Sequence, residues 1–370
     1  MNRRPSQRRV QSPSAAGAQR YRTTDPDRFL AETRRKKPLG RRIFRAFFWF
    51  LALLFAANAF LSLYPRLSRS SVPVTGLNPA LEGYTLLHLS DLKGTSFGQR
   101  QGRLESLLRD ERFDAVVLSG DMVSERGNAQ PLYDLIEMLG RIRPAAPVYF
   151  IAGDSDPQAV SMDYASGGSP FAPWVLGCQQ RGARWLTSPV LLSAGPQDVW
   201  LAPSSDLSLD TESQQARFEQ LYLLAKKSGD ENEIELAEYQ LRRLEGQRSA
   251  RSAMKKDAVC IAVTHVPPEE SFLSALRSPS GGSIALMLSG HWLGGLVRVP
   301  FTGPLFLPSS SLPRYGLFPR RDVSGISRVG ATWLYQNPGL GAYDPLYPSF
   351  FRRFFNPPTA ALLTLIPSSL

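Results

Sequence analysis

The run Tyr84-Thr-Leu-Leu-His-Leu-Ser90, which is followed by Asp91, sets the pattern for the rest of the chain. Two further runs of the same form follow it: Asp114-Ala-Val-Val-Leu-Ser-Gly120 before Asp121, and Pro147-Val-Tyr-Phe-Ile-Ala-Gly153 before Asp154. Helical stretches over 99–109 and 130–140 separate the three runs. Short apolar runs that alternate with helices predict βαβ units, and therefore an α/β fold whose sheet is covered on both faces.

Two later apolar runs are each followed by a histidine. Residues 258–263 precede His265 and residues 284–289 precede His291, in a chain with only three histidines. The third, His88, lies inside its strand, and we expect it to be a hydrogen-bonded core residue. The last part of the chain, rich in Pro, Gly and aromatic residues, predicts short antiparallel strands closed by residues 360–366.

Five acidic and imidazole side chains therefore share one position, the carboxyl end of a predicted strand. They are Asp91, Asp121, Asp154, His265 and His291. Ligands of open α/β sheets bind at that edge. Carboxylates and imidazoles that meet there without a compensating group of Lys or Arg need a cation among them. Mixed oxygen and nitrogen ligands favour Mn, Fe or Zn over calcium.

The motifs around these residues resemble those of a known family. They are Ser90-Asp91-Leu92-Lys93, Ser119-Gly120-Asp121, Ala152-Gly153-Asp154-Ser155-Asp156, Thr264-His265-Val266-Pro267-Pro268 and Ser289-Gly290-His291-Trp292-Leu293-Gly294-Gly295. In this order they resemble the calcineurin-like metallophosphoesterases, whose blocks are D-x-H, G-D, G-N-H-[D/E], H and G-H-x-H. The membrane-anchored bacterial branch looks nearest, and the resemblance covers about residues 80–367. It implies a four-layer αββα sandwich of two mixed sheets, and a two-metal site that hydrolyses phosphate esters.

The family's ligands carry over only in part. Asp91 matches a carboxylate of the first metal, and Asp121 matches the carboxylate shared by both metals. Asp154 stands where the family has Asn, while His265 and His291 match the imidazoles of the second metal. The resemblance thus implies a complete second-metal set and one divalent ion.

Three histidines of the family motifs are replaced here. Lys93 and Leu293 stand in place of two first-metal histidines, and Ser155 stands in place of the histidine that assists catalysis. We expect the Lys93 ammonium to occupy the place of the first cation, between Asp91 and Asp121. Asp156 is a candidate for the missing acid.

These substitutions leave two functions open. The first is a hydrolase with one metal that cleaves a phosphomonoester or phosphodiester, such as a small molecule or a lipid-like substrate near the membrane. The second is a catalytically inactive pseudo-phosphoesterase that binds a ligand or a partner. A third possibility, a structural membrane protein, does not explain why two of the three histidines lie at strand ends.

One segment between the predicted strands has a different composition. Residues 210–251 are charged, contain no proline and carry apolar residues at helical spacing, with a break at Ser228-Gly229-Asp230. This pattern predicts a helical hairpin inserted into the domain. We expect it to pack on the domain surface, and it is also a possible site for a protein partner.

The net charge of +11 comes from the start of the chain. Residues 1–42 hold 13 basic and 3 acidic residues, and Arg45 adds one more, so the remainder is neutral. We expect residues 1–42 to be a disordered basic tail. This distribution argues against a nucleic-acid-binding face on the folded body.

The segment that follows the tail predicts a membrane anchor. Residues 46–63 contain no charged side chain, about the minimum length for a membrane-spanning helix. We therefore expect an anchor over 43–64 and a solvated linker over 65–79. A cleaved signal peptide ending near Ala57-Asn58-Ala59 and a buried core helix are the alternatives. The basic tail predicts a cytoplasmic N-terminus and a C-terminal domain outside the cell membrane.

The chain contains two cysteines, Cys178 and Cys260. This number excludes a disulfide scaffold and a thiolate zinc cluster. We expect two buried thiols, with one disulfide bridge as the alternative.

Overall fold

The computed structural model describes residues 39–160, 170–208, 210–299, 303–307, 323–342 and 353–368. The chain divides into two units, one ending at Phe55 and the other beginning at Ala56. The predicted basic tail lies outside the described residues except for its last four, which are helical.

Helix α2 (Leu39–Leu63) contains the predicted anchor. Its segment Gly40–Leu63 has a mean hydropathy of 2.0 and is long and apolar enough to cross a membrane, by length and composition alone. Large side chains on it are exposed, with Phe44 at 70% and Trp49 at 67%. A buried core helix would hide such side chains, so that alternative does not describe α2.

The first of two large sheets carries the three aspartate-ending strands. Its order is β1-β14-β2-β3-β4-β5, formed by β1 (Arg66–Val74), β14 (Thr359–Pro367), β2 (Thr85–Leu89), β3 (Ala115–Leu118), β4 (Val148–Phe150) and β5 (Ala183–Trp185). Strands β2 to β5 are parallel, and β14 is antiparallel to β2. The carboxyl ends of β2, β3 and β4 therefore lie along one edge.

The second sheet carries the two histidine-ending strands. Its order is β12-β13-β9-β8-β7-β6, formed by β12 (Gly325–Val329), β13 (Thr332–Gln336), β9 (Leu286–Ser289), β8 (Val259–Val263), β7 (Val199–Pro203) and β6 (Val190–Ser193). Strands β13, β9, β8 and β7 are parallel, while both edge strands are antiparallel. A separate antiparallel pair consists of β10 (Val297–Val299) and β11 (Gly303–Phe306).

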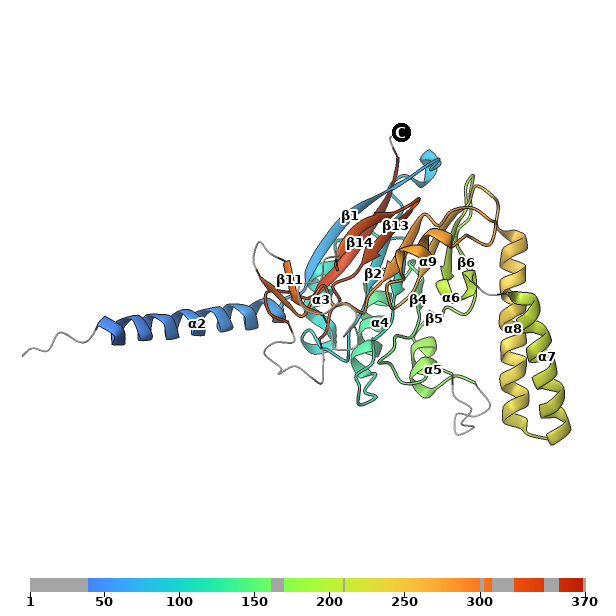
Figure 1. Ribbon diagram of the computed structural model, residues 1–370, viewed down its shortest axis with the longest axis horizontal. Coiled ribbons are helices and arrows are strands. Elements are labelled where there is room, and N and C mark those ends of the chain that lie inside the picture. Colours follow the sequence, from blue (N-terminus) through green and yellow to red (C-terminus); the bar gives the residue numbers. More distant parts are fainter. Residues whose placement is uncertain are drawn as a thin grey trace, which may run out of the picture. The chain divides into compact units, whose positions relative to one another are not determined.

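Three apolar clusters show that the domain has four layers. Between the sheets, side chains such as Leu86 of β2 pack with Ile261 of β8. The next residue of β2, Leu87, points to the opposite face and packs with α3 (Gly102–Leu108), α4 (Gln130–Ile142) and α5 (Pro173–Gln180). The outer face of the second sheet packs against Ala250 and Leu273, from α8 (Glu231–Ala253) and α9 (Glu270–Ala275). The predicted αββα sandwich of two mixed sheets is confirmed (Figure 1).

The segment expected to be a linker contributes a strand instead. Over the expected linker 65–79, residues Arg66–Val74 form β1, which pairs in parallel with β14. In Figure 1 these strands, blue and red, lie side by side although almost 300 residues separate them in sequence. The sequence pattern did not predict this strand because most residues of β1 are polar, and only Val72 and Val74 within it are buried.

The predicted helical hairpin is formed by α7 (Thr211–Ser228) and α8. Gly229 ends α7 in the left-handed conformation (φ 75°), which glycine adopts without steric cost. The Asp230 carboxylate then caps α8 by accepting hydrogen bonds from the amides of Asn232 and Glu233. The short helix α6 (Ser204–Leu207) connects β7 to this hairpin. Both cysteines are free and buried, so no disulfide joins them.

Candidate metal centre

The candidate ligands lie where the two sheets meet at the carboxyl ends of their strands. Hydrogen bonds join the loops of the two sheets: the His291 amide donates to Asp91 Oδ2 (3.1 Å), and His265 Nδ1 contacts the Ser119 carbonyl (2.8 Å). Asn337 Nδ2 donates to the His88 carbonyl (2.8 Å). These contacts fix the separation of the two strand edges, so the site is set by both sheets together.

The loops that hold the site have an unusual backbone. Five non-glycine residues adopt positive φ: Asp91 (52°), Lys93 (47°), Asp121 (55°), His291 (68°) and Leu293 (53°). Each such residue costs on the order of 1 kcal/mol, and surrounding hydrogen bonds must hold it. The Asp91 amide donates to the Gly120 carbonyl (3.0 Å), and the Lys93 amide donates to the Asp121 carbonyl (2.8 Å). The strained geometry is therefore present also at Lys93 and Leu293, the positions at which the resemblance leads us to expect histidines.

Two glycines allow these loops to approach one another. A Cβ at Gly120 (φ 97°) would lie 2.6 Å from the Gly153 amide nitrogen. A Cβ at Gly290 would collide with the Ser90 hydroxyl and lie 2.5 Å from Asp91 Oδ2. The glycines of the G-D and G-H blocks are thus required by the close packing of the loops around the site.

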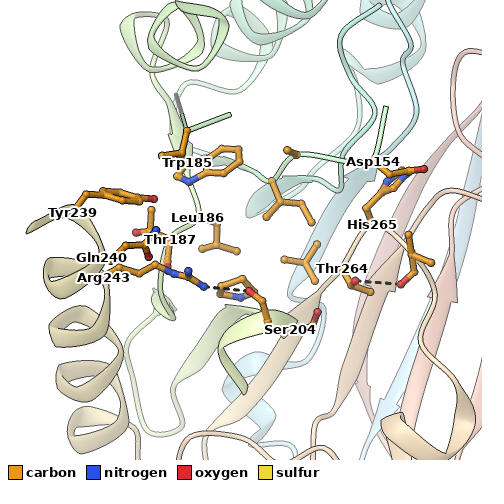
Figure 2. A pocket seen from close by; sticks show the side chains of 18 residues that line it. Asp154, Trp185, Leu186, Thr187, Ser204, Tyr239, Gln240, Arg243, Thr264 and His265 are labelled. Carbon is orange, nitrogen blue, oxygen red and sulfur yellow. Dashed lines mark hydrogen bonds and ion pairs between the residues drawn. The ribbon is translucent and has the colours of Figure 1, made fainter. Parts of the chain in front are cut away.

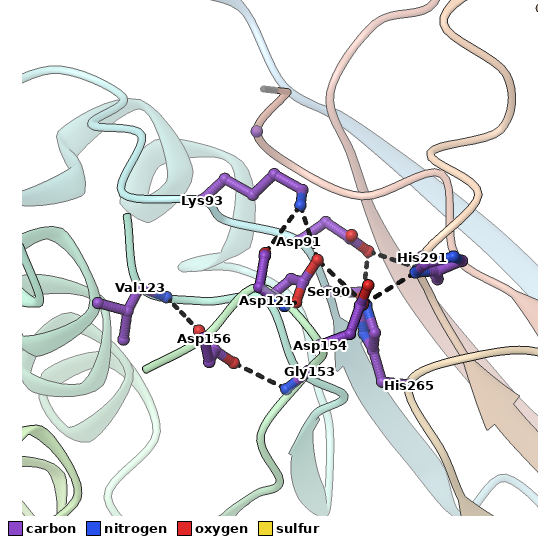
Figure 3. A network of polar contacts seen from close by, with 12 residues as sticks. Ser90, Asp91, Lys93, Asp121, Val123, Gly153, Asp154, Asp156, His265 and His291 are labelled. Atoms are coloured by element: carbon purple, nitrogen blue, oxygen red, sulfur yellow. Dashed lines mark hydrogen bonds and ion pairs between the residues drawn. The ribbon is translucent and has the colours of Figure 1, made fainter. Parts of the chain in front are cut away.

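Four of the five predicted ligands form one compact group. Donor atoms of Asp121, Asp154, His265 and His291 all lie within 4.8 Å of one another. His265 Nε2 lies 3.1 Å from Asp121 Oδ2 and 2.9 Å from Asp154 Oδ1. His291 Nδ1 lies 3.0 Å from the same Asp154 oxygen (Figure 3). We refer to these four residues as the second-metal cluster.

The hydrogen bonds of His265 indicate which nitrogen faces the cluster. Its Nδ1 lies 2.8 Å from a carbonyl oxygen, to which it can only donate. In the neutral ring, Nε2 then carries a lone pair that faces two carboxylate oxygens. This nitrogen is buried, and it forms no hydrogen bond of good geometry with the described residues. Burial works to lower the pKa of His265, but its contacts with Asp121 and Asp154 raise that pKa well above the ordinary value. A cation or a proton must lie among these atoms, so the donor set fits a divalent metal.

Lys93 lies beside this cluster. Its Nζ lies 2.6 Å from Asp121 Oδ2 and donates to Ser155 Oγ at 3.1 Å. Burial would lower the pKa of Lys93, but Asp121 and, through charge, Asp91 and Asp154 raise it. The lysine therefore carries a positive charge at neutral pH.

Asp91 lies at the edge of the group and is not one of its four members. Its Oδ2 accepts hydrogen bonds from Ser90 Oγ (2.6 Å) and from the His291 amide (3.1 Å). Its Oδ1 is buried and has no hydrogen-bond partner among the described residues. The described contacts of Lys93 include an ion pair with Asp121 but none with Asp91.

Asp156 faces away from the cluster. One carboxylate oxygen accepts from the Val123 amide (2.7 Å) and the other from the Gly153 amide (2.8 Å). Burial raises the pKa of Asp156 to about 6, against the effect of these two amides. The side chain therefore holds together the loops that carry Asp121 and Asp154, which is a positioning role, and Figure 3 shows it on the far side of Asp121 from the histidines.

Arg353 is a buried residue beside the site that the motifs did not indicate. Among the described residues, its guanidinium donates to backbone carbonyls, including those of Pro338 (2.6 Å) and Gly339 (2.8 Å). Burial lowers its pKa to about 10, and the charge of Asp91 opposes that effect. The sequence signal was an arginine in a stretch rich in proline and aromatic residues, but its burial depends on the tertiary fold.

His88 is a core residue, as expected. Its ring is fully buried, its Nε2 lies 2.8 Å from Ser119 Oγ, and Tyr335 packs on it edge-on with ring centroids 5.7 Å apart. Burial lowers the pKa of His88 to about 3, so the ring is neutral at physiological pH.

Comparison with known proteins identifies the family of this chain. The sequence model of the calcineurin-like phosphoesterase family matches residues 84–294, which include all five strand-end residues. An uncharacterized metallophosphoesterase, YkoQ of Bacillus subtilis (strain 168), is 30% identical over 78 residues. That match covers 21% of this chain and 29% of the length of YkoQ.

Solved structures of low sequence identity are also similar. Phosphopantetheinyl hydrolase (PptH) from Mycobacterium tuberculosis is 13% identical with a TM-score of 0.34, and the match covers 74% of this chain and 96% of PptH. TT1561 of Thermus thermophilus is 11% identical with a TM-score of 0.33, covering 70% of this chain and 90% of TT1561. The family match spans more than half of the sequence, and this chain belongs to the calcineurin-like phosphoesterase family.

Proposed function

We propose that this protein is a membrane-anchored phosphoesterase that hydrolyses a phosphomonoester or phosphodiester with one divalent ion in the second-metal cluster. The observation that carries this proposal is the position of His265 Nε2. It is buried 3.1 Å from an Asp121 oxygen and 2.9 Å from an Asp154 oxygen, and it forms no hydrogen bond of good geometry with the described residues. His291 supplies a second imidazole to the same group.

The four residues of the cluster would hold the ion, with Mn, Fe or Zn favoured by two carboxylates and two imidazoles. A divalent ion bound there supplies Lewis acidity toward a phosphoryl oxygen and lowers the pKa of a bound water. The Ser119 carbonyl fixes the tautomer of His265 by accepting from its Nδ1. Asp91 keeps the His291 backbone in place through its amide (3.1 Å).

Lys93 takes the role of a second cation in this proposal. Asp121 and Ser155 hold its ammonium group at 2.6 and 3.1 Å, and it is charged and largely buried. A charged ammonium group stabilises negative charge on a phosphoryl oxygen in the transition state, and it also binds the phosphate of the substrate through charge-assisted hydrogen bonds. The negative charge of Asp154, where the family has Asn, would offset the charge of the lysine.

A second candidate function is a non-catalytic phosphate-ester-binding protein. Ser155 accepts a hydrogen bond from Lys93, and both oxygens of Asp156 accept backbone amides. The Asp156 carboxylate is therefore engaged by the backbone and faces away from the cluster, and a serine hydroxyl is too weak an acid to protonate a leaving group. Loss of a general acid lowers rates by about 10²- to 10⁴-fold. In that case the hairpin is a candidate surface for a protein partner, because Leu223 and Leu224 of α7 are 66% and 55% exposed.

The proposed location follows from α2 and from the charge of the tail. We infer a single-pass protein of the cell membrane, with its basic N-terminus in the cytoplasm and its domain outside, since basic residues favour the cytoplasmic side. A nucleic-acid partner is not part of the proposal because the body is neutral. Protease added to intact spheroplasts should remove the domain but leave a membrane-bound N-terminal fragment. A domain that is cut only after lysis would contradict this orientation.

Metal content and turnover together test the proposed function. The full-length protein, purified in detergent and loaded with Mn, should contain one ion per chain by mass spectrometry and hydrolyse bis-p-nitrophenyl phosphate. The matched control is His265→Gln, which should lose both the ion and the turnover. One ion without turnover favours the non-catalytic function. Absence of the ion in the wild-type protein would exclude both.

A further inference from the structure

A cavity of about 420 Å³ lies between the second-metal cluster and helix α8. Asp154 and His265 form part of one wall, and Tyr239, Gln240 and Arg243 of α8 form part of another. Figure 2 shows these two groups on opposite sides of the space, with Trp185 and Leu186 between them. The volume falls within the range of about 300–1,000 Å³ that is typical of small-molecule sites.

Two aromatic residues give this cavity an apolar character. Trp185 is held by edge-on packing against Phe150 (5.3 Å between centroids) and Trp174 (6.2 Å). Tyr239 is held in the same way by Phe171 (5.4 Å). Aliphatic side chains complete the apolar lining: Ile151, Val160, Leu186, Val263 and Val266. An organic group that enters the cavity would therefore meet rigid apolar walls.

The charges on the α8 side cancel one another. Arg243 Nη2 lies 2.5 Å from Asp206 Oδ1, and Nε of the same arginine donates to the Thr187 carbonyl (3.3 Å). The Asp206 side chain is only 1% exposed, so this pair is a fixed part of the wall. An anionic group would find no free cation among the described lining residues on this side, whereas the polar edges of Thr187, Ser204 and Gln240 suit neutral hydrogen-bonding groups.

Helix α8 is anchored well enough to act as a wall. Ala250 and the adjoining Met254 belong to the core cluster on the outer face of the second sheet. A Cβ at Gly246 would lie 3.0 Å from Ser188 Oγ, so the helix approaches the body closely at that point. The inserted hairpin, whose segment 210–251 differs in composition from the rest of the domain, thus closes the cavity on this side.

We propose that this cavity binds the alcohol part of the phosphate ester, and that α8 makes the protein selective for an uncharged, mainly apolar aryl or alkyl group. This inference rests on the proposed function, because it assigns the phosphate to the second-metal cluster and Lys93. An ester whose phosphate reaches Asp154 and His265 would extend its organic group toward Tyr239. Burial of that group stabilises binding by about 25 cal/mol per Å² of apolar surface.

Binding measurements with separate probes test the cavity and the metal site independently. The probes are 1-naphthol for the cavity, inorganic phosphate with Mn for the metal site, and 1-naphthyl phosphate and glycerol phosphate for both together. Each is titrated by calorimetry into the full-length protein in detergent. The test variant is Gln240→Trp, which fills the cavity from α8 without removing a core side chain. The matched control is Gln220→Trp, the same change at an exposed position of α7.

In the wild-type protein, 1-naphthyl phosphate should bind at least about tenfold tighter than glycerol phosphate, a difference of about 1.4 kcal/mol. Gln240→Trp should abolish both this preference and the binding of 1-naphthol, while the affinity for inorganic phosphate stays within about twofold of the wild-type value. The control Gln220→Trp should change none of these three properties. The cavity inference is overturned if 1-naphthol does not bind, if glycerol phosphate binds as tightly as the naphthyl ester, or if Gln240→Trp behaves like Gln220→Trp. Failure of the proposed function gives a different result, in which 1-naphthol still binds but inorganic phosphate with Mn does not.

Discussion

The ammonium nitrogen of Lys93 and Oδ2 of Asp121 lie 2.6 Å apart, with side chains only 10% and 2% exposed. The same carboxylate oxygen lies 3.1 Å from His265 Nε2. Asp121 therefore stands between a lysine and an imidazole, in the position that the family resemblance assigns to the carboxylate shared by two metals. Asp121 thus has room for a cation on each side, and on one side the Lys93 ammonium already supplies that positive charge.

Removing the lysine charge should destabilise the metal-free protein. In Lys93→Met the buried Asp121 carboxylate loses its lysine and keeps only the neighbouring His265 as a cationic partner. Breaking a buried ion pair by removing one partner costs up to about 3–5 kcal/mol. Urea unfolding in the presence of a chelator measures the change. The matched control is Lys255→Met, because Lys255 pairs with Asp198 at 3.2 Å but is 55% exposed, and we expect a loss of less than about 1 kcal/mol there. Equal stabilities of the two variants would contradict a structural role for the Lys93 charge.

Placing histidine at the three positions where the family motifs have it should raise catalytic activity. The combined change Lys93→His, Ser155→His and Leu293→His supplies two metal ligands and a general acid, and positions 93 and 293 already have the left-handed φ that their loops impose. We expect Mn content to rise from one ion toward two, and turnover of bis-p-nitrophenyl phosphate to rise by about 10²- to 10⁴-fold.

The control for this variant carries glutamine at the same three positions, which changes polarity without adding imidazoles. It should keep one ion and the wild-type turnover or less. A histidine variant that folds, binds two ions and gains no turnover would show that other residues silence the site.

The strands of the site could be predicted because each is a short apolar run, and the first three runs alternate with helical stretches. The run 84–90 forms β2 (Thr85–Leu89), and the run 258–263 forms β8 (Val259–Val263). Strand β1 could not be predicted in this way. It is polar over most of its length, and what makes it a strand is its pairing with β14, a contact between distant parts of the sequence.

The candidate ligands could be predicted for a similar reason, because strand ends and motif glycines locate them in any α/β sheet. The roles of Asp156 and Arg353 could not, since they depend on which backbone groups the fold brings to each side chain. Asp156 carries the same type of group as Asp154 two residues earlier, yet it accepts two amides and faces away from the cluster. Local sequence does not distinguish these two carboxylates.

Asp154 offers a test of the charge in the second-metal cluster. Asn in its place keeps an oxygen ligand but removes one negative charge, so Asp154→Asn should bind Mn about tenfold more weakly than wild type. Asp154→Ala removes the ligand itself and should weaken binding beyond the roughly 100-fold limit typical of second-sphere changes. Calorimetric titration of Mn into the metal-free protein measures both. Equal affinity of the alanine variant and the wild type would remove Asp154 from the ligand set.

His88 should make the stability of the protein depend on pH. Its folded-state pKa is lowered to about 3 by burial, whereas the unfolded chain has an ordinary histidine pKa of about 6.5. Between these values the unfolded state binds one more proton than the folded state, so stability is lost as the pH falls below 6.5. The slope from this one group approaches about 1.4 kcal/mol per pH unit.

Comparison with His88→Gln isolates this contribution, because glutamine can keep a hydrogen bond to Ser119 Oγ but does not titrate. His265 has a raised pKa and contributes with the opposite sign in the metal-free protein, but it is present in both proteins and cancels in the difference. Urea unfolding of wild type and variant at pH 7, 6, 5 and 4, with the same metal content, should show the wild type losing stability more steeply below pH 6.5. Parallel curves over this range would mean that His88 takes up a proton in the folded state at an ordinary pKa. That result would contradict the lowered pKa expected for a fully buried imidazole.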